Sequence, residues 1–119
     1  MQLQKSYAAL RTANLPAAES WYTKLLGRGP DHRPMDTLVQ WELSDHGGVM
    51  VSTDEDIAGE GVLFLVVGDV AAERRRLHPL GIVPGDDIRG DYSTLAQVRD
   101  PDGNRITLAT PPARPYPPA

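Results

Sequence analysis

The sequence predicts an α+β fold built from two equivalent halves. A faint internal duplication is the first indication, because Ala17-Ala18-Glu19 followed by Gly27 recurs as Ala71-Ala72-Glu73 followed by Gly81, each pair 54 positions apart. In both copies an apolar strand pattern precedes an amphipathic helix that ends at glycine. The length of 119 residues suits one domain, which buries roughly two-thirds of the surface exposed by its unfolded chain.

The first half is expected to begin with a strand over residues 6–12, where small and apolar side chains alternate. Asn14 can then cap a helix that has Pro16 in its first turn, where the missing N–H costs nothing. This helix is expected to run to Leu26 and to end at Gly27, which can adopt positive φ. Its apolar residues fall on one face, as in a helix that lies on a sheet: Ala18, Trp21, Tyr22, Leu25 and Leu26.

Strands are predicted over residues 37–43 and 48–52, with residues 44–47 as their hairpin loop. The acidic, glycine-containing segment 53–61 suits a linker between the halves. In the second half, residues 62–67 form a fully apolar run typical of a buried strand, Asp69 caps a helix, and Pro79 with Gly81 ends it. Segment 82–89 shows no clear pattern. Strands over 95–99 and 105–109 flank the turn residues 100–104.

Composition excludes several classes of function. Without cysteine there is neither a disulfide framework nor a thiolate metal site nor a cysteine nucleophile. A formal net charge of −4 argues against a nucleic-acid partner, because such affinity comes mainly from clustered Lys and Arg. The basic run Arg74-Arg75-Arg76 is interpreted as a solvated helix face. No apolar stretch has the roughly 18 residues of a membrane span, so we expect a cytoplasmic protein without a membrane partner.

Two motifs resemble those of the vicinal oxygen chelate (VOC) superfamily, which includes glyoxalase I, bleomycin-resistance proteins and extradiol dioxygenases. Residues 21–27 (WYTKLLG) are similar to its aromatic-Tyr-x-x-x-Leu-Gly helix end, and residues 98–106 (VRDPDGNRI) to its last hairpin. The resemblance implies two βαβββ repeats, over residues 5–53 and 61–110, that form an incomplete curved β-barrel around a cavity. It also implies a single domain over residues 1–110 and a homodimer.

Metal-dependent members of the superfamily place His, Glu or Gln ligands on the first and last strands of each unit. The resemblance puts Tyr7, Met50, Val62 and Thr107 at these four positions. Valine and the Met thioether are poor ligands for divalent metals, and neutral hydroxyls are weak ones. We therefore expect neither a metal nor another cofactor. The three histidines, His32, His46 and His78, fall in separate parts of the expected fold, so no shared site is predicted for them.

A cavity with an apolar and aromatic lining remains as the candidate ligand site. Strand alternation gives each side chain a parity, although it leaves open whether Trp41 lines the cavity or the core under the helix. Aromatic surroundings with a few polar groups favour flat ligands. The predicted ligand-binding residues are Tyr7, Trp41, Met50, Phe64, Gln97, Arg99 and Thr107.

The leading hypothesis is a metal-independent binding protein that holds a small apolar or aromatic molecule, for example by sequestering an antibiotic. The alternative is an enzyme, either a VOC-type lyase or isomerase or another with an atypical or metal-free active site that uses Tyr7 or Arg99. No catalytic residue is predicted under the leading hypothesis. A third possibility is an interaction module that uses the Pro-rich tail, residues 111–119, which contains five prolines and is expected to be polyproline-like or disordered.

Overall fold

The computed structural model describes residues 1–119 and confirms the two-unit α+β fold, without a closed barrel. Each unit contains a strand, a helix and then three strands. In chain order the elements are β1 (Ser6–Thr12), α1 (Leu15–Leu26), β2 (His32–Met35), β3 (Leu38–Ser44), β4 (Gly47–Thr53), β5 (Val62–Val66), α2 (Val70–Leu77), the 3₁₀ helix η1 (His78–Leu80), β6 (Ile88–Arg89), β7 (Thr94–Arg99) and β8 (Arg105–Ala109).

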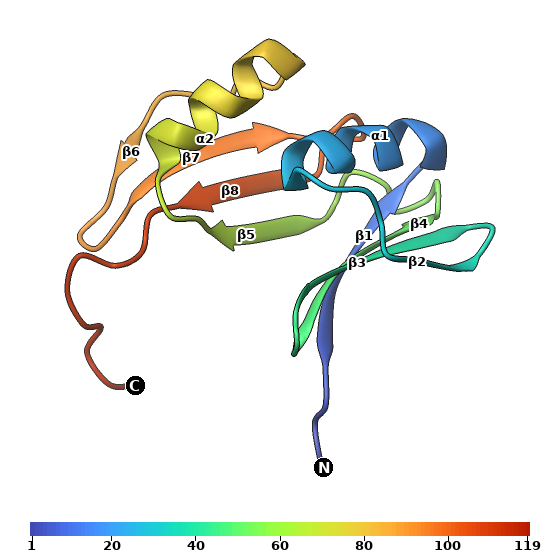
Figure 1. The fold of residues 1–119 in the computed structure, drawn as a ribbon, viewed down its shortest axis with the longest axis horizontal. Coiled ribbons are helices and arrows are strands. Elements are labelled where there is room, and N and C mark those ends of the chain that lie inside the picture. The colour runs from blue at the N-terminus through green and yellow to red at the C-terminus, as the bar shows by residue number, and fades with distance from the viewer.

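Each unit forms its own four-stranded sheet. We call them sheet A, with strand order β1-β4-β3-β2, and sheet B, with order β5-β8-β7-β6. The first strand of each unit pairs in parallel with the last strand, while the other pairs are antiparallel. A parallel pair needs a crossover connection, and α1 and α2 lie within these connections. Together the two units form an arch with the N- and C-terminal segments at its two feet (Figure 1).

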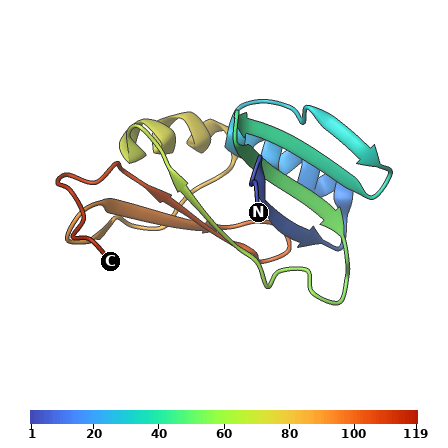
Figure 2. The same cartoon turned by 90° about the horizontal axis from the view of Figure 1, so that it is seen from below.

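Helix α1 begins and ends where local chemistry predicts. The Asn14 side chain accepts a hydrogen bond from the Ala17 N–H, and Gly27 adopts φ 74° as the left-handed C-cap residue. Side chains of the helix that face inward, Ala18, Tyr22 and Leu25, are buried. The helix therefore covers one face of sheet A, and seen from below the arch it lies behind the strands of that sheet (Figure 2).

The interpretation of the arginine run as a solvated face is wrong for two of its three residues. The Arg76 guanidinium donates to the Lys24 carbonyl at 2.8 Å and to the Leu25 carbonyl at 2.5 Å, so it caps the last turn of α1 from the other unit. Arg74 donates to the Pro84 carbonyl at 3.0 Å and ties the segment after η1 to α2. The Arg76 contacts link segments 51 and 52 positions apart in the sequence.

Two strand expectations also need correction. β2 was expected as part of a connection, but it pairs with β3 as an exposed edge strand, a place where a residue such as Pro34 is tolerated. The apolar run of β5 predicts a buried strand. Only Leu63 is fully buried there, while Val62, Phe64 and Val66 are 67%, 59% and 60% exposed.

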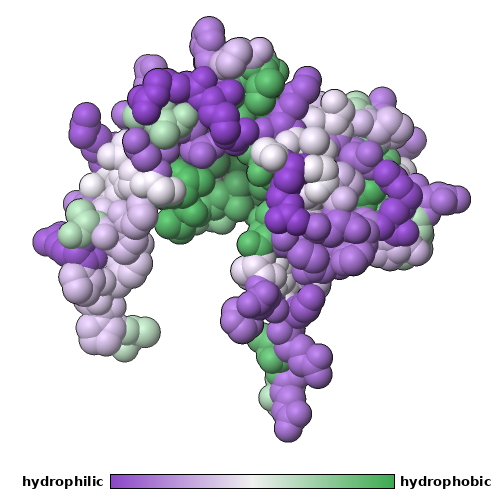
Figure 3. Space-filling model, viewed as in Figure 1, coloured by the Kyte–Doolittle hydropathy of each residue, from purple (hydrophilic) through white to green (hydrophobic).

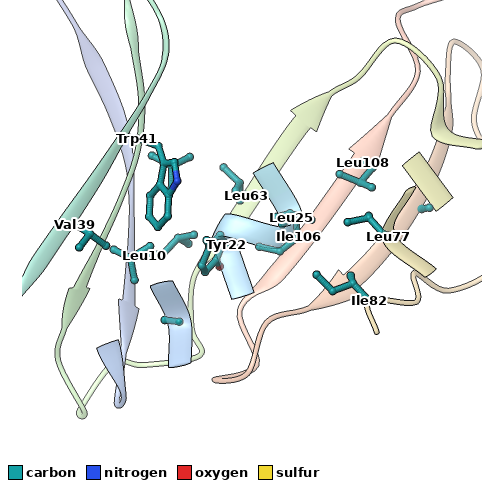
Figure 4. Close-up of a cluster of buried hydrophobic side chains, with 14 of the residues drawn as sticks. Leu10, Tyr22, Leu25, Val39, Trp41, Leu63, Leu77, Ile82, Ile106 and Leu108 are labelled. Atoms are coloured by element: carbon teal, nitrogen blue, oxygen red, sulfur yellow. The ribbon is translucent and has the colours of Figure 1, made fainter. Parts of the chain in front are cut away.

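One hydrophobic cluster spans both units. It contains 16 buried residues, among them Leu10 and Trp41 of the first unit and Leu63, Leu77 and Ile106 of the second. Tyr22 of α1 lies between the two groups of side chains (Figure 4). The helix-facing sides of the two sheets thus share a core, and their opposite sides are left open.

The hairpin at residues 100–104 is more than a turn, because it joins the two units. The buried Asp100 carboxylate accepts hydrogen bonds from the Tyr22 hydroxyl at 2.5 Å and from the Asn104 side-chain amide at 2.7 Å. The Asp102 carboxylate accepts from the Thr12 hydroxyl and the Ala13 N–H. These acceptors fix the second unit against β1 and α1.

Candidate functional site

The side of sheet A that faces away from α1, which we call open face A, carries the first group of candidate residues. Strand alternation places Leu10, Val49 and Trp41 on the buried side, so their neighbours in each strand point the other way. The register aligns these neighbours in rows across β1, β4 and β3. One row is Tyr7, Gly48 and Glu42, the next is Ala9, Met50 and Gln40, and the third is Arg11, Ser52 and Leu38.

Tyr7 and Glu42 are joined across the middle strand of this face. The Tyr7 hydroxyl lies 2.6 Å and 2.9 Å from the two carboxylate oxygens of Glu42 and donates to them. The residue between them in the row is Gly48. Adjacent strands are about 4.8 Å apart, so a tyrosine side chain can reach two strands across where no intervening side chain blocks it.

Further polar groups hold the Glu42 carboxylate in place. The Gln40 side-chain amide donates to Oε1 at 2.9 Å, and the Lys5 ammonium lies 3.5 Å from Oε2. The Tyr7 hydrogen bond, followed by the Gln40 one, lowers the pKa of Glu42, and the same bond raises the pKa of Tyr7. At neutral pH the face therefore carries an ionised carboxylate beside a neutral phenol.

The corresponding side of sheet B, open face B, is more apolar. Its exposed side chains on β5 are Val62, Phe64 and Val66, and an apolar area is visible in the hollow of the arch (Figure 3). The register pairs Phe64 with Thr107 on the neighbouring strand β8. The Thr107 hydroxyl accepts a hydrogen bond from the Gln97 side chain, on β7, at 3.2 Å. This face thus offers an apolar strip backed by one polar pair.

Arginines occupy one end of open face B. Arg99 and Arg105 are directly opposite each other on β7 and β8. The Arg99 guanidinium donates to the Gly103 carbonyl at 2.8 Å, which directs it toward its own hairpin. This end of the face is cationic, whereas Glu42 makes open face A anionic at its own end.

Within one chain the predicted ligand-binding residues do not line a common cavity. Tyr7 and Met50 lie on open face A, whereas Phe64, Gln97, Arg99 and Thr107 lie on open face B. The largest cavity, about 370 Å³, lies on the helix side between the end of α1 and α2. A smaller one of about 210 Å³ lies beside open face A, and its lining includes Ala9, Arg11 and Glu60.

The structure resolves the question that the sequence leaves open for Trp41. Trp41 has no exposed surface and packs under sheet A near Tyr22, with ring centroids 6.2 Å apart. Its indole N–H donates to the Arg28 carbonyl at 2.9 Å. The inclusion of Trp41 among the ligand-contacting residues is therefore corrected, because it belongs to the core.

The four positions that the resemblance assigns to metal ligands do not provide a suitable set of donors. The Tyr7 hydroxyl donates a hydrogen bond to Glu42, and the Thr107 hydroxyl accepts one from Gln97. Met50 and Val62 offer only a thioether and a hydrocarbon. His32, His46 and His78 lie in β2, in the β3–β4 turn and in η1. No group of three or more acidic or histidine side chains is placed to hold a metal ion.

Glu42 is the residue of this site that the sequence reasoning missed. The four metal positions that the resemblance assigns lie on the first and last strands of each unit, whereas Glu42 lies on β3. The available signal was the alternation of Gln40 and Glu42 with the apolar Val39 and Trp41. That pattern gives the face of Glu42 but not its contact with Tyr7, which is 35 positions away.

Comparison with known proteins identifies the fold. No protein-family model and no curated protein matches the sequence. Among solved structures, a glyoxalase/bleomycin resistance protein from Catenulispora acidiphila superposes with a TM-score of 0.82 at 24% identity, over 92% of this chain and 99% of that one. The chain therefore has the glyoxalase/bleomycin-resistance fold, the fold that the sequence resemblance implies.

Two further matches represent different activities on this fold. A bleomycin-binding protein, solved in complex with bleomycin, matches with a TM-score of 0.72 and 18% identity over 89% of this chain and 97% of its own. A lactoylglutathione lyase from Agrobacterium tumefaciens matches with a TM-score of 0.72 and 21% identity, over 87% of this chain and 90% of its own length. The fold alone thus supports binding and catalysis equally.

Neither α1 nor α2 has the length and apolar composition that a membrane-spanning helix requires.

Proposed function

We propose that the chain is a metal-independent small-molecule-binding protein that holds an apolar or aromatic ligand on its open sheet faces. The observation that carries this proposal is the chemistry of the four family metal positions, where none of the side chains is a good ligand for a divalent ion. Tyr7, Met50 and Phe64 instead offer aromatic and polarisable surface for a flat molecule. The match to a bleomycin-binding protein supports binding as a use of this fold.

The test is a titration with planar compounds, and the structure indicates which signal to follow. Trp41 is on the core side of sheet A, so tryptophan fluorescence is a poor reporter of the open face. Met50 lies on that face, and the chain has three methionines in all. In protein labelled with ¹³C at the methionine methyl groups, we expect the Met50 signal to shift on binding. If no planar compound shifts it at millimolar concentration, binding on this face is excluded.

The same proposal includes a homodimer, because each open face is incomplete within one chain. Three β-branched or aromatic side chains in a row, each more than half exposed, make an apolar strip of the kind that marks an interface. The anionic end of open face A and the arginines of open face B are complementary in charge. We therefore propose that open face A of one subunit lies near open face B of its partner, with the ligand between them.

Phe64→Glu is expected to weaken this dimer, because the new carboxylate would have to be buried without a partner. We expect wild-type protein to sediment as a dimer at about 100 μM and the variant to shift toward monomer by analytical ultracentrifugation. Val83→Glu is the matched control, since Val83 is 65% exposed but lies in the loop after η1. A monomeric wild type, or equal effects of both substitutions, would refute the dimer.

An enzyme without a metal is the second candidate. The observation in its favour is the Tyr7–Glu42 pair, in which a phenol and a carboxylate share a short hydrogen bond and could pass a proton to or from a bound molecule. Metal analysis of purified protein separates this candidate from a conventional metal-dependent lyase. A stoichiometric divalent metal whose removal abolishes turnover would overturn metal independence.

A further inference from the structure

We propose that Glu42 recognises a positively charged nitrogen of the ligand, so that the preferred ligand is a flat molecule bearing a protonated amine. This inference rests on the proposed binding function and adds the chemical class of the ligand. It starts from the carboxylate itself, which is ionised, only partly exposed and held in one position by Tyr7 and Gln40. A fixed carboxylate loses little entropy when it binds a cation.

Within one chain the neighbourhood of Glu42 leaves room for an external cation. Its strongest partners, the Tyr7 hydroxyl and the Gln40 amide, are neutral and do not cancel its charge. The His32 ring nitrogen is 3.9 Å away and the side chain of His32 is 59% exposed. Asp31 accepts a hydrogen bond from the Glu42 backbone N–H at 2.7 Å, and the Arg28 guanidinium pairs with it. Because Arg28 offsets the negative charge of Asp31, this pair adds little net charge beside Glu42.

Lys5 shows where an ammonium group can lie. Its Nζ is 3.5 Å from Glu42 Oε2, longer than the 2.7–2.9 Å of a strong charge-assisted hydrogen bond, and its side chain is 48% exposed. Lys5 precedes β1 in a segment without regular structure. A long, half-exposed ion pair of this kind contributes little, so a ligand amine can displace Lys5 at small cost.

The row beside Tyr7 can receive the flat part of the same ligand. Ala9 is small and exposed, and Met50 provides a soft thioether in the adjacent strand. The Tyr7 ring adds a π face to which a cation is attracted. A molecule with one aromatic unit and one amine a single carbon away can therefore contact Met50 and Glu42 together.

The test compares two probes of nearly equal shape, 1-naphthylmethylamine, which is protonated at neutral pH, and 1-naphthalenemethanol, which is neutral. We expect calorimetry to show that wild-type protein binds the amine roughly three- to tenfold more tightly. Glu42→Gln should remove this preference by lowering the affinity for the amine to that for the alcohol, because Gln can still accept the Tyr7 hydrogen bond but carries no charge. Lys5→Gln should raise the affinity for the amine alone, by about twofold or more.

Glu55→Gln is the control, since it makes the same charge change in the exposed segment between β4 and β5. An amine preference that survives in Glu42→Gln, or that Glu55→Gln removes equally, overturns the proposal. Equal affinity of the wild type for the two probes overturns it as well but leaves the proposed binding function standing. If neither probe binds and the Met50 signal responds to no planar compound, both proposals fail.

Discussion

Asp100→Ala is expected to destabilise the protein by about 3 kcal/mol or more, because the variant leaves several buried donors without an acceptor. The carboxylate receives four hydrogen bonds, from the Tyr22 hydroxyl, the Asp102 N–H, and the N–H and side-chain amide of Asn104. Tyr22 and Asn104 are at most 1% exposed, so water cannot replace the lost acceptor without rearrangement. The measurement is chemical denaturation, supported by a melting temperature that falls by roughly 10 °C.

Two variants separate the interaction between the units from the turn itself. Tyr22→Phe removes only the hydrogen bond that Asp100 accepts from the first unit, and we expect it to cost about 1.5–3 kcal/mol, as for a hydrogen bond to a charged group. Asp86→Ala is the surface control and should change stability by less than about 0.5 kcal/mol. If Tyr22→Phe has no effect while Asp100→Ala is strongly destabilising, Asp100 serves only its own hairpin.

The same hairpin shows what the sequence can and cannot predict. The turn at residues 100–104 follows from local chemistry, as do the Asn14 cap and the Gly27 end of α1, since each depends on neighbours a few positions away. The partners of Asp100 and Arg76 lie 78 and 51 or 52 positions away. No local pattern marks such contacts, so the sequence predicts the turn but not its bond to Tyr22, and it predicts a solvated Arg76.

Strand faces show a similar limit. The uninterrupted apolar run over 62–67 has no polar residue to mark an exposed side, so it predicts a buried strand, whereas Phe64 is exposed and Leu63 buried. β2 is recognisable only through its pairing with β3, because its own four residues are all exposed. For the candidate site, alternation correctly gives the parity of Tyr7. It cannot show that open faces A and B do not enclose a cavity within one chain.

The sequence leaves open whether Trp41 contacts a ligand or belongs to the core, and the structure places it in the core. Its substitution is the second change for which we expect a large effect. Trp41→Ala should cost about 3–5 kcal/mol, the range for removing a fully buried large aromatic side chain. The exposed fraction of Trp41 is 0%, and its loss would open a void between sheet A and Tyr22. Trp21→Ala, at a partly buried position, should cost less by denaturation under the same conditions.

Trp41→Phe tests whether Trp41 contacts the ligand in a variant that is expected to fold. It keeps most of the buried volume but leaves the Arg28 carbonyl without its donor, so we expect a loss of about 1–2 kcal/mol and a folded protein. Because Trp41 lies on the core side of sheet A, this variant should bind planar ligands with unchanged affinity in the Met50 titration. Weaker binding by a stable Trp41→Phe protein would show that the tryptophan reaches the ligand after all, and would place the site on the helix side of the sheet.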